Sequence, residues 1–471
     1  MTAVPAKDGG GRHALRGALV MAIWTLVSRV LGYVRDAAML AVFGASAGQG
    51  AFLLAWTVPN LFRRLLGEGA VSAAVQPALA QAEEEEGEET AKELFASFQG
   101  LLLVLLIGVL ILGEAVVFTW RAALEPNPEN MDLRRTLWFT ACLLPYVVPI
   151  CMSALAAAPQ NLRHRFLWPS IAPVLLNIVW IGGLAWVTWL TDYPLGRLEL
   201  LPIVVLFGGL LQWGLQWPGL RSIGWSLRPR FRRSDARRRR AVLAFLPALL
   251  GMAALQINVA LDQVLVRELV DETANNYSFY ANRLLHLPLA LVGIAAMTGS
   301  MPLFSRLAAS RDFPALSTAL GRGCESTLLL IMAAGLGLAV IADPLLTLLF
   351  QRGEFTADDV ARLTPTVHAY LCVLPFAAIG GLLTRAHQSL GSYRLPALAA
   401  TLSVPINLIL DWILLPKYGV QAAGWATAVS IAVQALILML IGRARGDTDT
   451  GLALCFKVLC KRFPQRRLIY Q

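Results

Sequence analysis

Apolar runs of membrane-spanning length follow one another along almost the whole chain. Hydrophobic residues make up 57% of its 471 residues, and charged residues only 15%. A helix needs about 20 consecutive apolar residues to cross a bilayer, and about twelve runs approach or exceed this length. They lie near residues 14–43, 51–80, 93–120, 134–158, 167–190, 199–220, 241–268, 277–304, 315–350, 363–389, 395–415 and 420–442. The sequence therefore predicts an all-α polytopic membrane protein of about twelve transmembrane helices, not a soluble enzyme.

Basic residues are concentrated in the loops that follow even-numbered runs. Arg163 follows the fourth run, the arginine-rich segment 221–240 follows the sixth, and Arg443 follows the twelfth. Loops rich in arginine and lysine stay in the cytoplasm, so we expect both chain termini to be cytoplasmic. The same pattern explains the formal net charge of +10 without a nucleic-acid partner. The six cysteines show no spacing typical of a metal site or a disulfide framework.

An internal repeat divides the chain into two parts. Pro145-Tyr146 and Gln160-Asn161 recur in the same order, and at nearly the same spacing, as Pro375-Phe376 and Gln388-Ser389. We therefore expect two six-helix halves around a central cavity, both entering the membrane from the same side. Transporters with such parallel repeats bind their substrate between the halves. The expected parts are a first half at 1–220, a basic cytoplasmic linker at 221–240, a second half at 241–443 and a basic cytoplasmic tail at 444–471.

Arginines and carboxylates interrupt the first two apolar runs. They lie in Ser28-Arg29-Val30-Leu31-Gly32-Tyr33-Val34-Arg35-Asp36 and in Pro59-Asn60-Leu61-Phe62-Arg63-Arg64-Leu65-Leu66-Gly67-Glu68, and Arg283 lies in the eighth run. An ionisable side chain at the bilayer centre costs roughly 2.5–3.5 kcal/mol, so it normally faces a watery or protein-lined space. A guanidinium can bind two phosphate oxygens at once. We interpret the set as a cationic cavity. Structural ion pairing, or snorkelling to a helix end, is the alternative and best suits Arg64.

A second polar set lies in the later runs. Asp262 belongs to the seventh run, and Asn407 and Asp411 lie one helical turn apart in the eleventh, on one helix face. Thr427 in the twelfth run can add an oxygen. Carboxylate and amide oxygens suit a small hard cation or a proton. The alternative is that Asp411 lies in water at a helix end, near Lys417.

The arginine-containing motifs resemble a known family. Ser-Arg-x-Leu-Gly-x-x-Arg-Asp from Ser28, followed by Pro-Asn-x-x-Arg-Arg-x-x-x-Glu-Gly-Ala from Pro59, is similar to the MurJ/MviN family of the multidrug/oligosaccharidyl-lipid/polysaccharide exporter superfamily. Members are lipid II flippases of bacterial inner membranes, which move an undecaprenyl-diphosphate-linked peptidoglycan precursor outward. Two family acids are replaced, by Gly50 and by Asn282.

The resemblance implies specific roles for residues of this chain. The substrate-binding residues it implies are Ser28, Arg29, Arg35, Asp36, Asn60, Arg63, Glu68 and Arg283. Some members bind sodium between helices seven, eleven and twelve, which matches Asp262, Asn407, Asp411 and Thr427. The implied partners are lipid II and membrane lipids. We expect a monomer with no cofactor beyond coupling to sodium or protons.

Two other functions remain as alternatives. One is export of a different lipid-linked oligosaccharide by a member of the same superfamily. The other is a membrane enzyme acting on prenyl diphosphates. Such an enzyme needs a metal-binding or acid–base set at the membrane surface, and the sequence shows no such pattern. We therefore expect an alternating-access lipid flippase, which is a transporter and not an enzyme.

Overall fold

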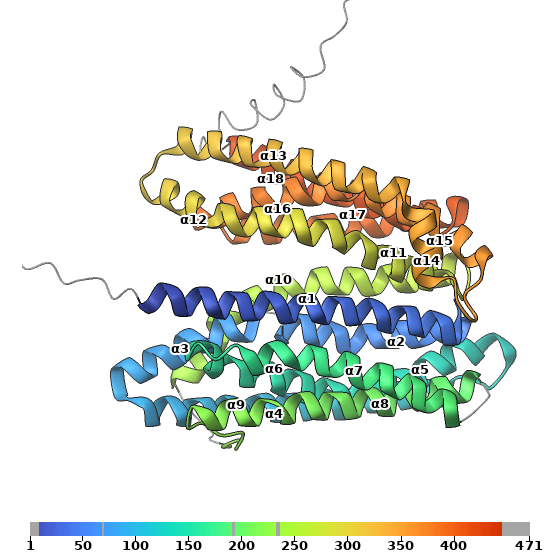
Figure 1. Cartoon of the computed structure of the whole chain (residues 1–471), viewed down its shortest axis with the longest axis horizontal. Coiled ribbons are helices and arrows are strands. Elements are labelled where there is room, and N and C mark those ends of the chain that lie inside the picture. Colours follow the sequence, from blue (N-terminus) through green and yellow to red (C-terminus); the bar gives the residue numbers. More distant parts are fainter. Residues whose placement is uncertain (1–8, 68–69, 191–193, 232–235, 445–471) are drawn as a thin grey trace, which may run out of the picture. The chain divides into compact units, whose positions relative to one another are not determined.

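The computed structural model describes residues 9–67, 70–190, 194–231 and 236–444. All regular elements in these ranges are helices, so the predicted all-α class is confirmed (Figure 1). The chain forms two compact units. Unit 1 contains residues 1–256 and 352–356, and unit 2 contains residues 257–351 and 357–471. The predicted boundaries of the two halves, the linker and the tail stay a prediction.

Unit 1 is built from long helices with two interruptions within predicted spans. Its elements are α1 (Gly9–Phe43), α2 (Ala47–Phe62), the π-helix η1 (Arg63–Gly67), α3 (Ala70–Glu86), α4 (Glu88–Ala123), the 3-10 turn η2 (Pro128–Asn130), α5 (Met131–Leu143), the 3-10 turn η3 (Leu144–Tyr146), α6 (Val147–Leu162), α7 (Leu167–Leu190), α8 (Pro194–Gly214) and α9 (Gln216–Ser222). α10 (Ala236–Leu269) begins in unit 1 and continues into unit 2.

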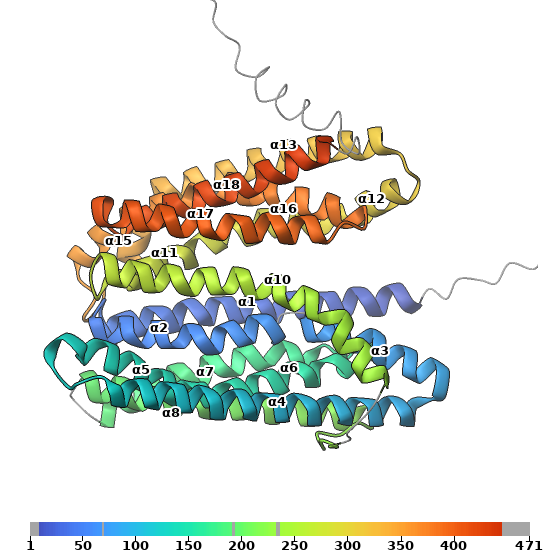
Figure 2. The ribbon, with the colours of Figure 1, turned by 180° about the vertical axis from the view of Figure 1, so that it is seen from behind.

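Unit 2 contains the remaining helices, among which α17 and α18 lie side by side (Figure 2). Its elements are α11 (Ala274–Pro288), the π-helix η4 (Leu289–Ile294), α12 (Ala295–Ala309), α13 (Phe313–Val340), α14 (Ala342–Phe350), α15 (Ala357–Leu371), α16 (Leu374–Ser389), α17 (Arg394–Tyr418) and α18 (Gln421–Ala444).

Prolines lie near helix interruptions at matching places of both units. Pro59 comes shortly before η1, and Pro288 directly precedes η4. Pro145 lies in η3, and Pro375 lies at the start of α16, just after a break in the helix. Proline has no N–H and crowds the carbonyl one turn before it, which weakens an α-helix. Pro59 and Pro288 still lie within α2 and α11, and each π-helix begins after its proline. The sequence repeat therefore has a structural counterpart in these interruptions.

Nine helical stretches in the described ranges are long and apolar enough to cross a membrane. The first is Glu88–Ala123 and the last is Gln421–Leu440. On α4, Ile111 and Leu112 are exposed, which suits contact with lipid. A helical membrane protein is thus confirmed, whereas the count of twelve spans stays a prediction.

An aromatic cluster forms the centre of unit 1. The ring of Phe52 packs edge-on against Phe139 and Trp180, with centroids 5.7 and 6.0 Å apart. Trp56 contacts Trp180 and Tyr146 at 5.0 and 5.3 Å. Such pairs contribute about 0.5–1.5 kcal/mol each beyond the burial of their area. The cluster joins α2, α5, η3 and α7, and it fixes the position of Trp180. Unit 2 has a hydrophobic core of its own around Phe304, Leu382 and Leu438.

The C-terminal end of α1 is capped by residues 352–356. The last carbonyls of a helix lack partners within the helix. The N–H of Glu354 donates to the carbonyl of Ala41 at 3.0 Å, and Phe355 is buried. Gly353 and Gly44 have φ angles of 57° and 60°, a left-handed backbone conformation that glycine adopts at little cost. Because these two residues are glycines, the backbone of residues 352–356 can lie close to the end of α1. This contact caps the helix that carries Arg29 and Arg35.

The first part of the predicted linker packs on α4. The ring of Trp225 is buried against Phe95, with centroids 5.5 Å apart. The N–H of Arg230 donates to the carbonyl of Ala96 at 2.8 Å. Residues 224–231 are therefore an integral part of unit 1.

Candidate functional site

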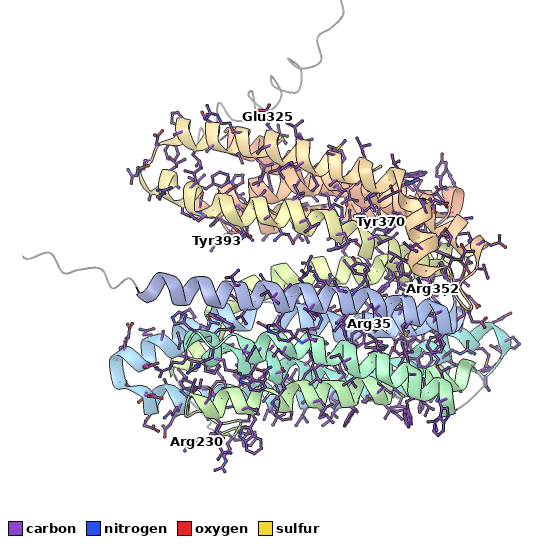
Figure 3. All side chains as sticks on the ribbon, in the orientation of Figure 1. Arg35, Arg230, Glu325, Arg352, Tyr370 and Tyr393 are labelled. Atoms are coloured by element: carbon purple, nitrogen blue, oxygen red, sulfur yellow. The ribbon has the colours of Figure 1, made fainter. Side chains whose placement is uncertain are left out.

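Arg35, labelled in Figure 3, lies on α1 and is buried in unit 1. Its Nη2 and Nε donate to Oδ1 of Asp36 at 2.8 and 3.1 Å, and its Nη1 donates to Oδ1 of Asn177 at 3.3 Å. The guanidinium carbon lies 4.7 Å from the centroid of the Trp180 ring, within cation–π range. Arg35 is 8% exposed and Asp36 is 3% exposed. The positive charge is thus matched by one carboxylate, an amide oxygen and an aromatic face.

Asn177 links α7 to α1. Its Nδ2 donates to the carbonyl oxygen of Ser28 at 3.0 Å and to Oγ of Ser28 at 3.4 Å. These bonds orient the amide, so that Oδ1 faces Arg35. Three predicted site residues, Ser28, Arg35 and Asp36, therefore meet at one place. We call these three residues with Asn177 and Trp180 the arginine cluster.

Arg29 and Arg63 lie outside the arginine cluster. The side chain of Arg29 is exposed on α1. Arg63 opens the π-helix η1 and is half-buried, and its Nε and Nη2 donate to Oδ1 of Asn60 at 3.1 and 3.0 Å. Arg64 donates from Nη1 to Oε1 of Gln256 at 3.3 Å. Asn60 therefore orients Arg63, one turn before it.

Two predicted substrate-binding residues remain, Arg283 and Glu68. Arg283 is half-buried on α11 in unit 2, shortly before Pro288. Glu68 lies outside the described residues.

Unit 2 contains a buried cluster of oxygen atoms. Nδ2 of Asn407 donates to Oδ1 of Asp262 and to Oδ2 of Asp411, at 2.8 Å each. Oγ of Ser430 donates to Oδ1 of Asn407 at 2.9 Å, and Nδ2 of Asn258 reaches Oδ2 of Asp262 at 3.5 Å. We call these five residues the oxygen cluster. Asp411 is fully buried, which excludes the alternative that places it in water.

The two carboxylates of the oxygen cluster both accept from the amide of Asn407 and so lie close together. Among the described residues, no cationic side chain forms an ion pair with Asp262 or Asp411. Oδ1 of Asp411 is buried and has no hydrogen-bond partner among the residues that the structure describes. Hard cations prefer several oxygen ligands of this kind, so the residues fit a sodium ion or a proton.

Comparison with known proteins identifies the family. The family model described as lipid II flippase MurJ matches residues 39–462. The chain belongs to the MurJ family. A probable lipid II flippase MurJ of Vibrio cholerae is 30% identical over 91% of this chain and 82% of its own length. The lipid II flippase MurJ of Burkholderia cenocepacia is 28% identical over 92% of this chain and 84% of its own length.

Solved structures agree on the fold. A lipid II flippase MurJ in an inward closed conformation is similar with a TM-score of 0.74 and 24% identity, over 95% of this chain and 94% of that one. An inward-facing multidrug transporter of the MATE family is similar with a TM-score of 0.67 and 14% identity, over 94% of this chain and 96% of that one. The MurJ/MviN family predicted from the motifs is confirmed. The MurJ family is one of flippases, so the expectation of a transporter and not an enzyme is confirmed as well.

In this MurJ-family chain, several polar residues of the two clusters were not predicted from the sequence. Asn177 is a single polar residue within an apolar run, and that isolation was an available signal, whereas Asn258 and Ser430 have other polar residues close by in the sequence. Thr427, which was predicted, bonds through Oγ1 to the carbonyl of Ala423 in its own helix at 2.8 Å. Ser430, on the next turn of the same helix, makes the contact to Asn407.

Proposed function

We propose that the chain is a lipid II flippase of the bacterial inner membrane. It carries the undecaprenyl-diphosphate-linked precursor across the bilayer by alternating access. Membership of the MurJ family is the observation that carries this proposal. Both termini are cytoplasmic in this proposal, and the protein works as a monomer.

In this proposal, Arg29, Arg63 and Arg283 bind the diphosphate. The side chains of Arg63 and Arg283 are half-buried and that of Arg29 is exposed, and arginine forks suit phosphate oxygens. Arg35 joins them in this proposal, and its ion pair with Asp36 holds it in place. Asn60 holds Arg63 in place through its amide oxygen.

The π-helices support the assignment of Arg63 and Arg283. Single π turns within α-helices often mark functional sites. Arg63 lies in η1, and Arg283 comes one to two turns before η4. Interrupted helices in corresponding positions of two repeats are a recognised pointer to a transporter's binding site.

The experiment is complementation in a strain depleted of its own lipid II flippase. The wild-type chain should restore growth, and Arg63→Ala should not, at equal membrane levels. Arg63→Lys should restore growth poorly, because an ammonium lacks the bidentate fork. Arg306→Ala is the matched control, since Arg306 is exposed in the last turn of α12. Full growth with the double variant Arg29→Ala and Arg63→Ala would overturn the diphosphate assignment.

A second measurement separates transport from the enzymatic alternative. Purified protein in liposomes should move labelled lipid II between leaflets. It should release no phosphate from a prenyl diphosphate. Phosphate release that depends on Arg63 would favour the enzyme. Transport of another lipid-linked oligosaccharide without lipid II transport would favour the related exporter.

We further propose that the oxygen cluster binds a cation, sodium or a proton, which couples transport to an ion gradient. In the structure, the NH2 group of Asn407 lies between the two carboxylates, where a cation would be attracted. Rotation of this amide would present its oxygen instead. Ser430 can follow the rotation, because a hydroxyl both donates and accepts. A cation bound by ligands on α10 and α17 would bias one conformation of unit 2.

The test is melting of purified protein against sodium, with potassium keeping ionic strength constant. A ligand that binds the folded state stabilises it by mass action, so wild type should melt at a higher temperature in sodium. Asp411→Asn should lose this gain. Asp343→Asn, which changes an exposed acid of α14, should keep it. An equal sodium gain in wild type and in Asp411→Asn would contradict the site.

A further inference from the structure

Hydrogen-bonded polar side chains continue from the oxygen cluster toward one end of unit 2. On α10, Gln263 follows Asp262 directly and is buried. Its Nε2 donates to Oγ of Ser278 on α11 at 3.1 Å. This hydroxyl lies 2.7 Å from the hydroxyl of Tyr370 on α15, which is labelled in Figure 3. Tyr370 lies within electrostatic range of both Asp262 and Asp411. Polar groups of three helices are therefore gathered near the two carboxylates.

The polar side chains reach the surface at the turn between α10 and α11. One helical turn further along α10, the buried Arg267 donates from Nη1 to Oδ1 of Asn275 at 3.1 Å. Asp271, in the turn itself, is partly exposed and accepts from Nη2 of Arg362 on α15 at 2.7 Å. Polar groups thus follow one another from the buried carboxylates to solvent. We call these side chains, from Gln263 to Asp271, the polar column.

The polar column follows the shortest way out of the unit. Asp262 lies seven residues before the end of α10 at Leu269, and Asp411 lies seven residues before the end of α17 at Tyr418. At 1.5 Å per residue, each carboxylate is about 10 Å from that end of its helix. The other end of α10, at Ala236, is about 40 Å from Asp262 along the helix axis. The turn between α10 and α11 is therefore the nearer exit along α10.

Unused acceptor atoms and local charge favour a cation on this way out. Oε1 of Gln263, Oδ1 of Asn258 and Oδ1 of Asp411 are buried and have no hydrogen-bond partner among the described residues. All three are acceptor atoms, which suit a cation or the water that accompanies it. Residues 267–273 and 357–362 contain five carboxylates and two guanidiniums. This excess of negative charge attracts cations to the end of the column.

We propose that the polar column is the route by which the cation of the oxygen cluster exchanges with solvent. The oxygens of Gln263, Ser278 and Tyr370 replace part of the cation's hydration shell as it passes. The guanidinium of Arg267 lies between them and the surface, and it raises the barrier to entry. In the predicted topology the turn between α10 and α11 is outside the cytoplasm, so the oxygen cluster responds to the external cation. The inference rests on the cation site proposed above and adds its side of access.

The experiment follows cation binding in time, in purified full-length protein mixed rapidly with sodium in micelles. Tryptophan fluorescence is the signal, because Trp412 follows Asp411 directly on α17. Potassium keeps ionic strength constant, and the trace of Asp411→Asn is subtracted. Tyr370→Phe and Gln263→Leu should each slow binding and release alike, by roughly tenfold, which corresponds to about 1.4 kcal/mol in the barrier. The dissociation constant should change little, because a route affects rates and not affinity.

Further variants sharpen the test. Arg267→Gln removes a positive charge from the route and should speed both binding and release. Tyr393→Phe is the matched control for Tyr370→Phe, because Tyr393 is exposed at the start of α17, and it should leave both rates unchanged. Repeating the mixing as a pH jump without sodium covers a proton as the occupant. If Tyr370→Phe does not fold, Gln263→Leu carries the test.

Three results would overturn the inference, and they are distinguishable. Wild-type rates in both Tyr370→Phe and Gln263→Leu would remove the route and leave the cation site standing. A weaker dissociation constant at an unchanged binding rate would make these residues ligands or packing contacts, not a route. A wild-type signal equal to that of Asp411→Asn, in both the sodium and the pH jump, would remove the cation site and the route with it. Complementation and lipid II transport test the flippase independently of both.

Discussion

Replacing Gly353 by alanine should loosen the cap on α1. Gly353 has a φ angle of 57°, and a Cβ built there would overlap the carbonyl oxygen of Ala41. That oxygen accepts the N–H of Glu354 at 3.0 Å. The left-handed conformation costs an L-residue about 1–2 kcal/mol. The overlap adds the loss of this hydrogen bond, about 0.5–1.5 kcal/mol net. We therefore expect Gly353→Ala to lower the free energy of unfolding by about 1.5–3.5 kcal/mol.

Gly391 provides the matched control. Its φ angle is 76°, and a Cβ built there meets no atom within 4 Å. Gly391→Ala should therefore show the conformational cost alone, about 1–2 kcal/mol. The difference between the variants, about 1 kcal/mol, corresponds to roughly fivefold in the unfolding equilibrium constant.

The assay is equilibrium unfolding in mixed micelles, followed by tryptophan fluorescence. Gly44→Ala gives an independent check, because its φ angle is 60° and its Cβ would lie 2.7 Å from the carbonyl oxygen of Glu354. It should resemble Gly353→Ala. If Gly353→Ala and Gly44→Ala are no more destabilising than Gly391→Ala, then residues 352–356 do not cap α1 in the way described.

Two further predictions concern pH and topology. Burial raises the pKa of Asp271, but hydrogen bonds from Thr273 and Arg362 lower it more, so its pKa lies below the usual range. A depressed pKa means that the ion pair stabilises the protein above the unfolded pKa, about 4, and is lost as pH falls through the folded pKa. Asp271→Asn should thus reduce the acid-side fall in melting temperature, by a small amount because the pair is partly exposed; an unchanged pH profile would contradict it. For the topology, the native cysteines are first replaced, and Glu129→Cys should then react with an impermeant thiol reagent in intact cells. Arg228→Cys should react only after permeabilisation, since the arginine-rich segment is expected in the cytoplasm. The reverse pattern would mean that the predicted topology is inverted.

The sequence by itself determined the features that depend on neighbouring residues. Apolar runs of bilayer length become helices in the described residues, because a backbone in lipid must satisfy its own hydrogen bonds. Pro59 and Pro288, which belong to the sequence repeat, lie shortly before the two π-helices. The arginine motifs pointed to the family. Asn407 and Asp411 were placed on one helix face by their spacing alone.

Only the tertiary structure decided which polar groups meet. The sequence placed Arg35 near Arg29 on one helix, and only the structure shows that its neighbours Asn177 and Trp180 come from α7, far along the chain. Helix periodicity says which side of α1 a residue occupies, and packing decides whether that side meets α7 or a cavity. The same holds for the bond from Glu354 to Ala41 and for the place of Ser430 beside Asn407. A buried polar group must find a partner wherever the fold supplies one, and the partner's position along the chain is set by the packing of helices.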